Sequence, residues 1–344
     1  LKPKGRRLWG CCPFHSEKTP SFSVTPDTQL YYCFGCHAGG GVIQFVMQAE
    51  RLTYTEAVKS LAQRAGMELP EEVNDENLQR ERAQKERLYG ACREAARYYV
   101  RNLLGEQGEA ARQYLIRRGI KASAVKAFGL GYALPGWENL AQYMEQKGVS
   151  PETLVEAGLA IRGKQGRIYD AYRDRIIFPI ISANGRVLGF GARTMGDDTP
   201  KYLNTGDTPI FNKRYNLYGL NLQRGKRPGD LIMVEGYMDV VRLYEGGVTN
   251  AVASLGTALT VQQARLLKRY VPRVYICYDG DAAGQNATLR GMDILAGEGL
   301  EVRVMAIPGG QDPDEYVGAH GGEGFLSLKD QAKNLQEYKL DALW

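Results

Sequence analysis

No stretch of this 344-residue sequence approaches the roughly 20 apolar residues that a membrane-spanning helix needs. Residues 1–7 are basic and lack the apolar centre of a secretion signal. The sequence also contains no Gly-x4-Gly-Lys-Ser/Thr loop for binding nucleotide phosphates. We therefore expect a cytoplasmic protein that does not enter a membrane. Because an initiator Met is missing and the last residues have a helical pattern, we also expect a fragment of a longer chain.

Cysteine and histidine are scarce, yet four of the six cysteines fall between residues 11 and 36. Without a secretion signal, this crowding indicates a metal site rather than disulfides. The segments Cys12-Pro-Phe-His15 and Cys33-Phe-Gly-Cys36 have the spacing of a tetrahedral zinc site. Protein ligands fill all four positions, so we expect one structural zinc ion. Cys11 and His37 adjoin these ligands and could replace a neighbour, but the spacing favours Cys12 and Cys36, and we assign Cys11 and His37 no role.

The residues around this site have the pattern of a small zinc ribbon. Residues 21–24 and 30–33 alternate like strands, and residues 42–47 and 54–65 are expected to form helices. Such a segment cannot bury much core, so metal binding would supply much of its folding free energy.

Three short apolar runs after residue 230 each lead to acidic residues. These are Glu235 with Asp239, Asp279 with Asp281, and Asp312 with Asp314. Apolar runs followed by helical stretches are typical of parallel strands, whose carboxyl ends meet at one edge of a sheet. So many carboxylates would repel one another unless divalent cations neutralised them. The pattern therefore predicts a Mg²⁺ site, and such a site usually handles phosphates.

Basic residues concentrate before residue 230, although the net charge is only +5. A basic half beside a metal-binding half suits a polyanion whose phosphates react, and scattered solvated charges are the alternative. Residues 172–180 resemble an edge strand, and Asn184-Gly185 predicts a hairpin turn into residues 187–193. The candidate residues for binding nucleic acid or nucleotide are Arg118, Arg175, Arg193, Lys201, Tyr202, Asn204 and Lys213.

Several motifs, taken in order, resemble those of bacterial DnaG-type primases over nearly the whole chain. They are the two zinc-ligand segments, Glu17-Lys-Thr-Pro-Ser-Phe-Ser23, Glu235-Gly-Tyr-Met-Asp-Val240, Ser254-Leu-Gly-Thr-Ala-Leu-Thr260, Tyr278-Asp-Gly-Asp-Ala-Ala-Gly284 and Asp312-Pro-Asp-Glu315. The resemblance implies a multidomain α/β protein with an amino-terminal zinc ribbon. A mixed α+β basic subdomain, a parallel α/β core of the Toprim type and the start of a helical subdomain would follow. The expected segments are 1–70 (zinc ribbon), 71–87 (charged linker), 88–228 (basic subdomain), 229–314 (Toprim) and 315–344 (helical).

The resemblance also implies an activity, which is template-directed synthesis of short RNA primers on single-stranded DNA. The substrates would be ribonucleoside triphosphates, and the product would be an RNA primer for replication in a bacterium. Glu235, Asp279 and Asp281 would be the catalytic carboxylates and would bind two or more Mg²⁺ ions, for which Mn²⁺ can substitute. Asp239, Asp312 and Asp314 would complete the acidic surface. Glu235 could instead help to deprotonate the attacking hydroxyl.

The resemblance further implies a replicative helicase as partner, bound through a carboxyl-terminal domain that this sequence does not contain. Three alternatives compete with the primase interpretation. A Toprim nuclease or topoisomerase would use the same carboxylates, but it would not explain the ribbon or the basic half. A zinc-dependent DNA-binding module with a degenerate core conflicts with the intact acidic residues. The primase half of a phage primase–helicase is the third alternative.

Overall fold

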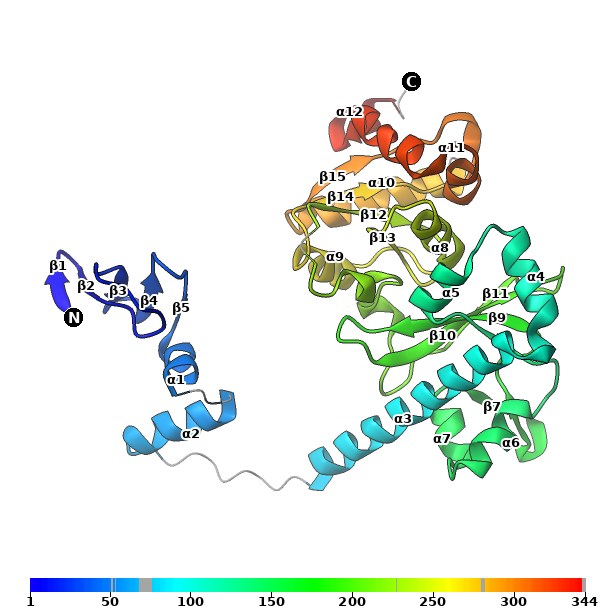
Figure 1. The fold of residues 1–344 in the computed structure, drawn as a ribbon, viewed down its shortest axis with the longest axis horizontal. Coiled ribbons are helices and arrows are strands. Elements are labelled where there is room, and N and C mark those ends of the chain that lie inside the picture. The colour runs from blue at the N-terminus through cyan, green and yellow to red at the C-terminus, as the bar shows by residue number, and fades with distance from the viewer. Residues whose placement is uncertain (51, 53, 68–75, 227, 280–281, 342–344) are drawn as a thin grey trace. The chain divides into compact units, whose positions relative to one another are not determined.

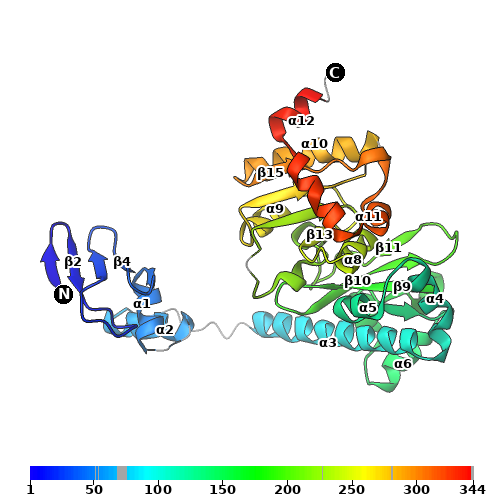
Figure 2. The ribbon, with the colours of Figure 1, turned by 45° about the horizontal axis from the view of Figure 1, so that its top comes forward.

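A computed structural model describes residues 1–50, 52, 54–67, 76–226, 228–279 and 282–341 (Figures 1 and 2). The chain divides into two compact units, Leu1–Glu81 and Arg82–Trp344. In the part that the structure describes, every helix is too short or too polar to cross a membrane.

The smaller unit is built on an antiparallel sheet with the strand order β1-β2-β3-β4-β5. The strands are β1 (Lys2–Lys4), β2 (Arg7–Gly10), β3 (Phe22–Thr25), β4 (Leu30–Cys33) and β5 (Gly39–Gly40), and helices α1 (Val42–Glu50) and α2 (Tyr54–Arg64) follow. β3 and β4 confirm the two strands that the sequence predicts, and α1 and α2 confirm the two helices.

The core of the smaller unit is very small. Its buried residues are Cys12, Phe22, Tyr31 and Cys33, against which Phe14 and Phe45 pack. Two of these four residues are candidate zinc ligands. Because so little apolar surface is buried, a bound metal would contribute a large share of the stability of this unit.

The larger unit contains an antiparallel sheet with the strand order β11-β10-β9-β6. Its strands are β6 (Gly131–Ala133), β9 (Arg175–Ile181), β10 (Val187–Thr194) and β11 (Tyr202–Asn204). The long helix α3 (Glu76–Leu104) runs along one face of this sheet in both views (Figures 1 and 2). Tyr99 of α3 packs with Phe190 of β10 in that layer, with ring centroids 5.5 Å apart.

The prediction of an edge strand at residues 172–180 is wrong, because β9 lies between β10 and β6. The pairing with β6 reaches only from Arg175 to Ile177. Pro179 lies beyond that pairing, so its missing N–H costs no hydrogen bond to β6. Prolines are typical of edge strands, and Pro179 lies in the half of β9 that β6 does not cover.

The second sheet of the larger unit has the order β13-β12-β14-β15-β16. Its strands are β12 (Asp230–Val234), β13 (Ala251–Ala253), β14 (Arg273–Ile276), β15 (Glu301–Val304) and β16 (Lys333–Asn334). The first four are parallel, and β16 is antiparallel to β15. This arrangement confirms the parallel strands that the sequence predicts at the three apolar runs.

Helices follow the parallel strands, as expected for a parallel sheet. They are α8 (Tyr237–Glu245), α9 (Val261–Lys268), α10 (Ala282–Gly297) and α11 (Pro313–Ser327), and α12 (Leu335–Asp341) ends the described chain. Helices α4 (Glu109–Arg117), α5 (Ala122–Phe128), α6 (Asn139–Gln146) and α7 (Pro151–Glu156) belong to the part before residue 160.

Two details of that earlier part are not indicated by the sequence patterns described above. Helix α3 ends at Leu104, where Gly105 precedes a short 3-10 turn that leads into α4. A small hairpin of β7 (Ala160–Arg162) and β8 (Ile168–Asp170) was not anticipated. Its strands are too short to give a clear alternating pattern.

Aromatic side chains join the two sheets of the larger unit. The ring of Tyr237, at the start of α8, stacks on Phe178 of β9 with centroids 5.4 Å apart. Tyr218 meets the same ring edge-on at 4.8 Å. A Cβ at Gly191 of β10 would lie 2.6 Å from the Tyr237 ring, so only glycine leaves room for this contact. The two sheets are therefore held in one fixed relation.

This close contact predicts the effect of a methyl group at position 191. Gly191→Ala should lower the unfolding free energy of the larger unit by about 1–3 kcal/mol, because the new methyl overpacks the sheet interface. Thermal and denaturant unfolding of the full chain would measure the change. Gly196→Ala is the matched control, since a Cβ there meets no atom within 4 Å. Equal stabilities of the two variants would contradict the close packing.

Candidate active site and metal centre

The zinc-ligand candidates Cys12, His15, Cys33 and Cys36 come together in the smaller unit. Their ligand atoms all lie within 4.8 Å of one another. The Cys12 and Cys36 sulfurs are 3.8 Å apart, as are Cys33 Sγ and His15 Nδ1. Ligands of a tetrahedral zinc ion at normal bond lengths lie about 3.5–3.8 Å from each other. The donor set and its spacing therefore fit a structural zinc ion.

Glu17 and Ser21 surround this centre with hydrogen bonds. Oε2 of Glu17 lies 3.3 Å from His15 Nε2, which leaves Nδ1 of that ring for the metal. Glu17 also accepts hydrogen bonds from the Cys12 N–H at 2.7 Å and from Ser21 Oγ at 2.5 Å. Ser21 Oγ lies 3.2 Å from Cys33 Sγ. The pair thus touches three ligand residues and can fix their orientation.

The two buried thiols differ in acidity. Burial raises the pKa of the Cys33 thiol, but hydrogen bonds from Ser21 Oγ and the Cys36 N–H outweigh burial and lower the pKa to about 6. Burial raises the pKa of the Cys12 thiol to about 11. A bound divalent cation would hold both residues as thiolates, which is the state that zinc coordination requires.

The neighbours Cys11 and His37 lie outside this group. Cys11 is exposed. His37 has a positive φ of 60°, and its Nδ1 lies 3.0 Å from the hydroxyl of Tyr32. The spacing preference for Cys12 and Cys36 therefore agrees with where the structure places the four ligand atoms.

A second site lies at the carboxyl ends of β12 and β14 in the larger unit. A cavity of about 310 Å³ is lined there by five of the predicted acidic residues, Glu235, Asp239, Asp279, Asp312 and Asp314. Asp281 lies outside the described residues. Among the residues that the structure describes, no three of these carboxylates gather as closely as the four zinc-ligand candidates do. Mg²⁺ keeps several waters and needs few protein ligands, so a wider arrangement suits it.

The acidic residues at the end of β12 and β14 are held by backbone groups. Glu235 Oε1 accepts a hydrogen bond from the Asp279 N–H at 3.0 Å. Asp239 Oδ2 accepts one from the Gly236 N–H at 2.9 Å at the start of α8. Burial, and then the carboxylates of Asp279, Asp312 and Asp314, raise the pKa of Asp239 to about 8. The negative charges around Asp239 therefore repel one another, and a bound divalent cation would neutralise them.

The two acidic residues at the start of α11 have different partners. Asp312 caps the helix by accepting a hydrogen bond from the Glu315 N–H at 2.7 Å. Asp314 Oδ1 lies 2.6 Å from Arg242 Nε, and its Oδ2 lies 3.7 Å from Arg118. Asp314 thus pairs with arginines and links the acidic edge to the preceding basic part.

Five of the predicted basic and polar residues line the same cavity as the acids. They are Arg118, Arg193, Lys201, Tyr202 and Asn204. Arg175 and Lys213 do not line it. Arg175 is buried and donates to the carbonyl oxygens of Pro200 at 2.9 Å and Lys201 at 3.3 Å, so it supports the segment that leads into β11.

Arg193 is the best placed cation for an anionic ligand. Its side chain is buried, its guanidinium lies 5.1 Å from the Tyr202 ring centre, and it donates to the Tyr202 hydroxyl. Its Nε has no hydrogen-bond partner among the described residues. A buried guanidinium donor without a partner in a cavity wall is suited to a phosphate oxygen.

Sequence reasoning missed two residues of this site, Tyr237 and Arg242. The Tyr237 hydroxyl donates to Asn204 Oδ1 at 2.6 Å, and Arg242 holds Asp314 and the Gly119 carbonyl. Both lie on α8, within two turns of Glu235. Their proximity to that acid was an available signal, but their partners are distant in the sequence.

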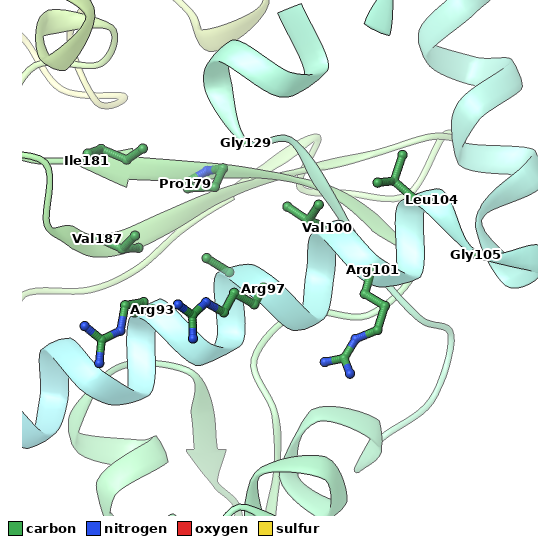
Figure 3. Close-up of a pocket in the computed structure, with 11 residues that line it drawn as sticks. Arg93, Arg97, Val100, Arg101, Leu104, Gly105, Gly129, Pro179, Ile181 and Val187 are labelled. Atoms are coloured by element: carbon green, nitrogen blue, oxygen red, sulfur yellow. The ribbon is translucent and has the colours of Figure 1, made fainter.

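A larger groove, of about 710 Å³, lies beside α3 and shares no lining residue with the acidic cavity (Figure 3). Its walls are mainly aliphatic, including Val100, Pro179 and Ile181. Figure 3 shows Arg101 pointing away from the strands that carry Pro179 and Val187, which are β9 and β10. None of the described residues that line the groove is acidic, so they offer no carboxylate ligands for a hard cation.

Three family profiles match the chain in order. Residues 1–77 match the CHC2 zinc finger, residues 98–224 match the amino-terminal domain of the DNA primase catalytic core, and residues 232–317 match a Toprim-like domain. The DNA primase of Clostridium acetobutylicum is 46% identical over 342 residues, which are 99% of this chain. This chain spans 57% of that relative's length.

Two solved structures have folds similar to that of this chain. A DnaG primase catalytic domain bound to ssDNA aligns with a TM-score of 0.72 and 39% identity, over 76% of this chain and 86% of that one. The zinc-binding and RNA polymerase domains of the Aquifex aeolicus primase align with a TM-score of 0.68 and 36% identity, over 97% of this chain and 81% of that one.

The hydrogen bonds of Glu17 generate a prediction for metal binding. Glu17→Gln removes the carboxylate that faces His15 and should weaken zinc binding roughly 10- to 100-fold, the range for losing such a partner. Competition with a chromophoric zinc chelator would measure the affinity. Glu50→Gln is the matched control, because Glu50 pairs with Arg64 in the same unit. Unchanged zinc affinity in Glu17→Gln would contradict this role.

Proposed function

Because the chain belongs to the bacterial DnaG-type family of DNA primases, we propose that it synthesises short RNA primers on single-stranded DNA. The substrates are ribonucleoside triphosphates, and each step releases pyrophosphate. This role in replication places the protein in the bacterial cytoplasm at the replication fork. A replicative helicase is the proposed protein partner.

The proposal rests mainly on one observation: acidic residues and basic residues line the same cavity. Carboxylates at the carboxyl ends of the parallel strands line it together with Arg118, Arg193 and Lys201. Metal ligands beside phosphate-binding cations are the requirement for nucleotidyl transfer. A nucleic-acid-binding module without catalysis would need only the cations.

We assign the chemistry of the acidic wall to Mg²⁺ ions bound by Glu235, Asp279 and Asp281, with Asp239 adding negative charge beside them. Such ions would activate a hydroxyl and neutralise the leaving pyrophosphate. Asp312 and Asp314 complete the acidic surface. In our proposal, Asp314 mainly orients Arg118 through the contacts described above.

We assign the triphosphate to the basic wall. Arg193 and Lys201 would bind its phosphate oxygens, and Tyr202, which holds the guanidinium of Arg193, would fix that donor in place. Tyr237 would keep Asn204 at the same wall. Arg175 would act indirectly by supporting the backbone of Lys201. Lys213 lies away from this cavity, and we assign it to nucleic acid outside the reacting centre.

The smaller unit would contact the single-stranded template. It carries a stacked pair of rings, Trp9 and Phe34, with centroids 5.7 Å apart, and Phe34 is 52% exposed. Tyr32 packs edge-on against Phe34. Exposed rings beside the basic residues of β1 and β2 suit the stacking of unpaired bases.

The proposal predicts RNA synthesis that depends on Asp279. With Mg²⁺, labelled ribonucleotides and single-stranded DNA, the chain should make short template-dependent RNA. Asp279→Ala should lower the rate by roughly two to three orders of magnitude, the scale of losing one preorganised charge at a reacting centre. Asp330→Ala, which changes an exposed carboxylate that does not line the cavity, is the matched control.

Two results would contradict the proposal. RNA synthesis that survives in Asp279→Ala would remove the metal site from the reaction. Mg²⁺-dependent cleavage of the template without synthesis would identify a Toprim nuclease instead.

A further inference from the structure

A second cavity adjoins the acidic one at Glu235. It has a volume of about 440 Å³ and is bounded by the loop after β13, by Tyr278 and by α10. Glu235, Ser254 and Gly256 line both this cavity and the acidic one. The catalytic carboxylate therefore stands in a wall that two cavities share.

The two cavities differ in charge and polarity. Three cations line the first, whereas Arg290 of α10 is the one cation among the described residues that line the second. The second also has aliphatic walls, formed by Leu259, Ala287 and Ile294. A triphosphate bound together with divalent cations suits the first cavity, because carboxylates for the metal ions and cations for the phosphates both line it. A nucleoside with one phosphodiester charge suits the second, where the base and ribose can contact apolar side chains.

We propose that the second cavity binds the 3′-terminal nucleotide of the growing primer. The inference rests on the proposed function. In phosphoryl transfer, the attacking and leaving oxygens lie on opposite sides of the phosphorus, roughly in line. With the triphosphate at Arg193 and Lys201, the attacking nucleotide must reach Glu235 from a place away from those cations. The second cavity shares Glu235 with the first but is lined by neither Arg193 nor Lys201.

The step balances with these placements. The 3′-oxygen of the primer forms a bond to the α-phosphorus, and the bond from that phosphorus to the oxygen that bridges to the β-phosphorus breaks. Pyrophosphate leaves with the electron pair of the broken bond. The hydroxyl proton passes to solvent. Arg290 pairs with the phosphate of the terminal nucleotide, and so it is a positioning residue for the attacking hydroxyl.

The surroundings of Arg290 support this assignment. Its side chain is exposed, and among the described residues it makes no ion pair or hydrogen bond, unlike Arg242 or Arg265. Its helix is fixed in place, because Gly291 leaves only 3.3 Å between an added Cβ and Ile276 of β14. The guanidinium can therefore meet a ligand without displacing another partner or moving α10.

Extension of an RNA primer annealed to a DNA template tests the inference. Arg290→Ala should raise the KM for primer–template roughly 10- to 100-fold, the scale of losing one charged hydrogen-bonding contact. The KM for the incoming ribonucleotide should change little. Arg290→Lys should recover part of the loss. Arg269→Ala is the matched control. Arg269 is an exposed arginine at the carboxyl end of α9, and it lines neither cavity.

Other patterns would overturn the inference. A rise confined to the ribonucleotide KM would assign the second cavity to the triphosphate, and no change in either KM would remove Arg290 from substrate binding. A photo-reactive 4-thiouridine at the primer 3′ end should crosslink the unmodified chain within the loop after β13 or α10, and crosslinks to β11 instead would contradict the placement. Failure of the unmodified chain to extend any primer would count against the proposed function itself.

Discussion

The packing of Tyr237 against the antiparallel sheet is the contact on which the candidate active site depends. Tyr237 begins α8 two residues after Glu235, stacks on Phe178 and donates its hydroxyl to Asn204. The acidic end of the parallel sheet and the basic end of the antiparallel sheet are thereby fixed against each other. Preorganised charges of this kind need no rearrangement when a reaction begins, and that is the main way such sites lower a barrier. The hydrogen bond from Arg242 of α8 to the Gly119 carbonyl, at 2.7 Å, adds a second link between α8 and the preceding basic part.

The smaller unit solves a different physical problem. In the described part of this unit, the core cluster of four buried residues is too small to stabilise a five-stranded sheet alone, and two of the four are candidate metal ligands. A bound zinc ion would therefore take the place of a larger core, and Glu17 with Ser21 would orient its ligands. Because the metal would hold the sheet together from inside, its outer face can expose aromatic rings that a larger core would otherwise bury. The stability of this unit and the exposure of these rings therefore have the same origin.

The sequence was informative where the determining residues are close together. The Cys-x2-His and Cys-x2-Cys segments predict the zinc ligands because their spacing is local, and the acids that follow apolar runs predict one sheet edge because parallel strands share a direction. Local sequence patterns do not predict contacts between residues that are distant in the sequence. The interior position of β9 depends on β6, more than forty residues earlier in the chain, and Arg242 meets Asp314 only through the fold. Likewise, the sequence shows a basic residue at position 175, but only the structure shows that Nη1 of Arg175 donates to backbone carbonyl oxygens just before β11.

The central claim is that acids and cations from two sheets form one nucleotidyl-transfer site. A crystal structure of the chain with Mn²⁺ and a non-hydrolysable ribonucleoside triphosphate tests it most directly. The account predicts anomalous signal from Mn²⁺ beside Glu235 and Asp279, and triphosphate oxygens on Arg193 and Lys201. Mn²⁺ bound elsewhere, or a triphosphate that contacts neither Arg193 nor Lys201, would contradict it.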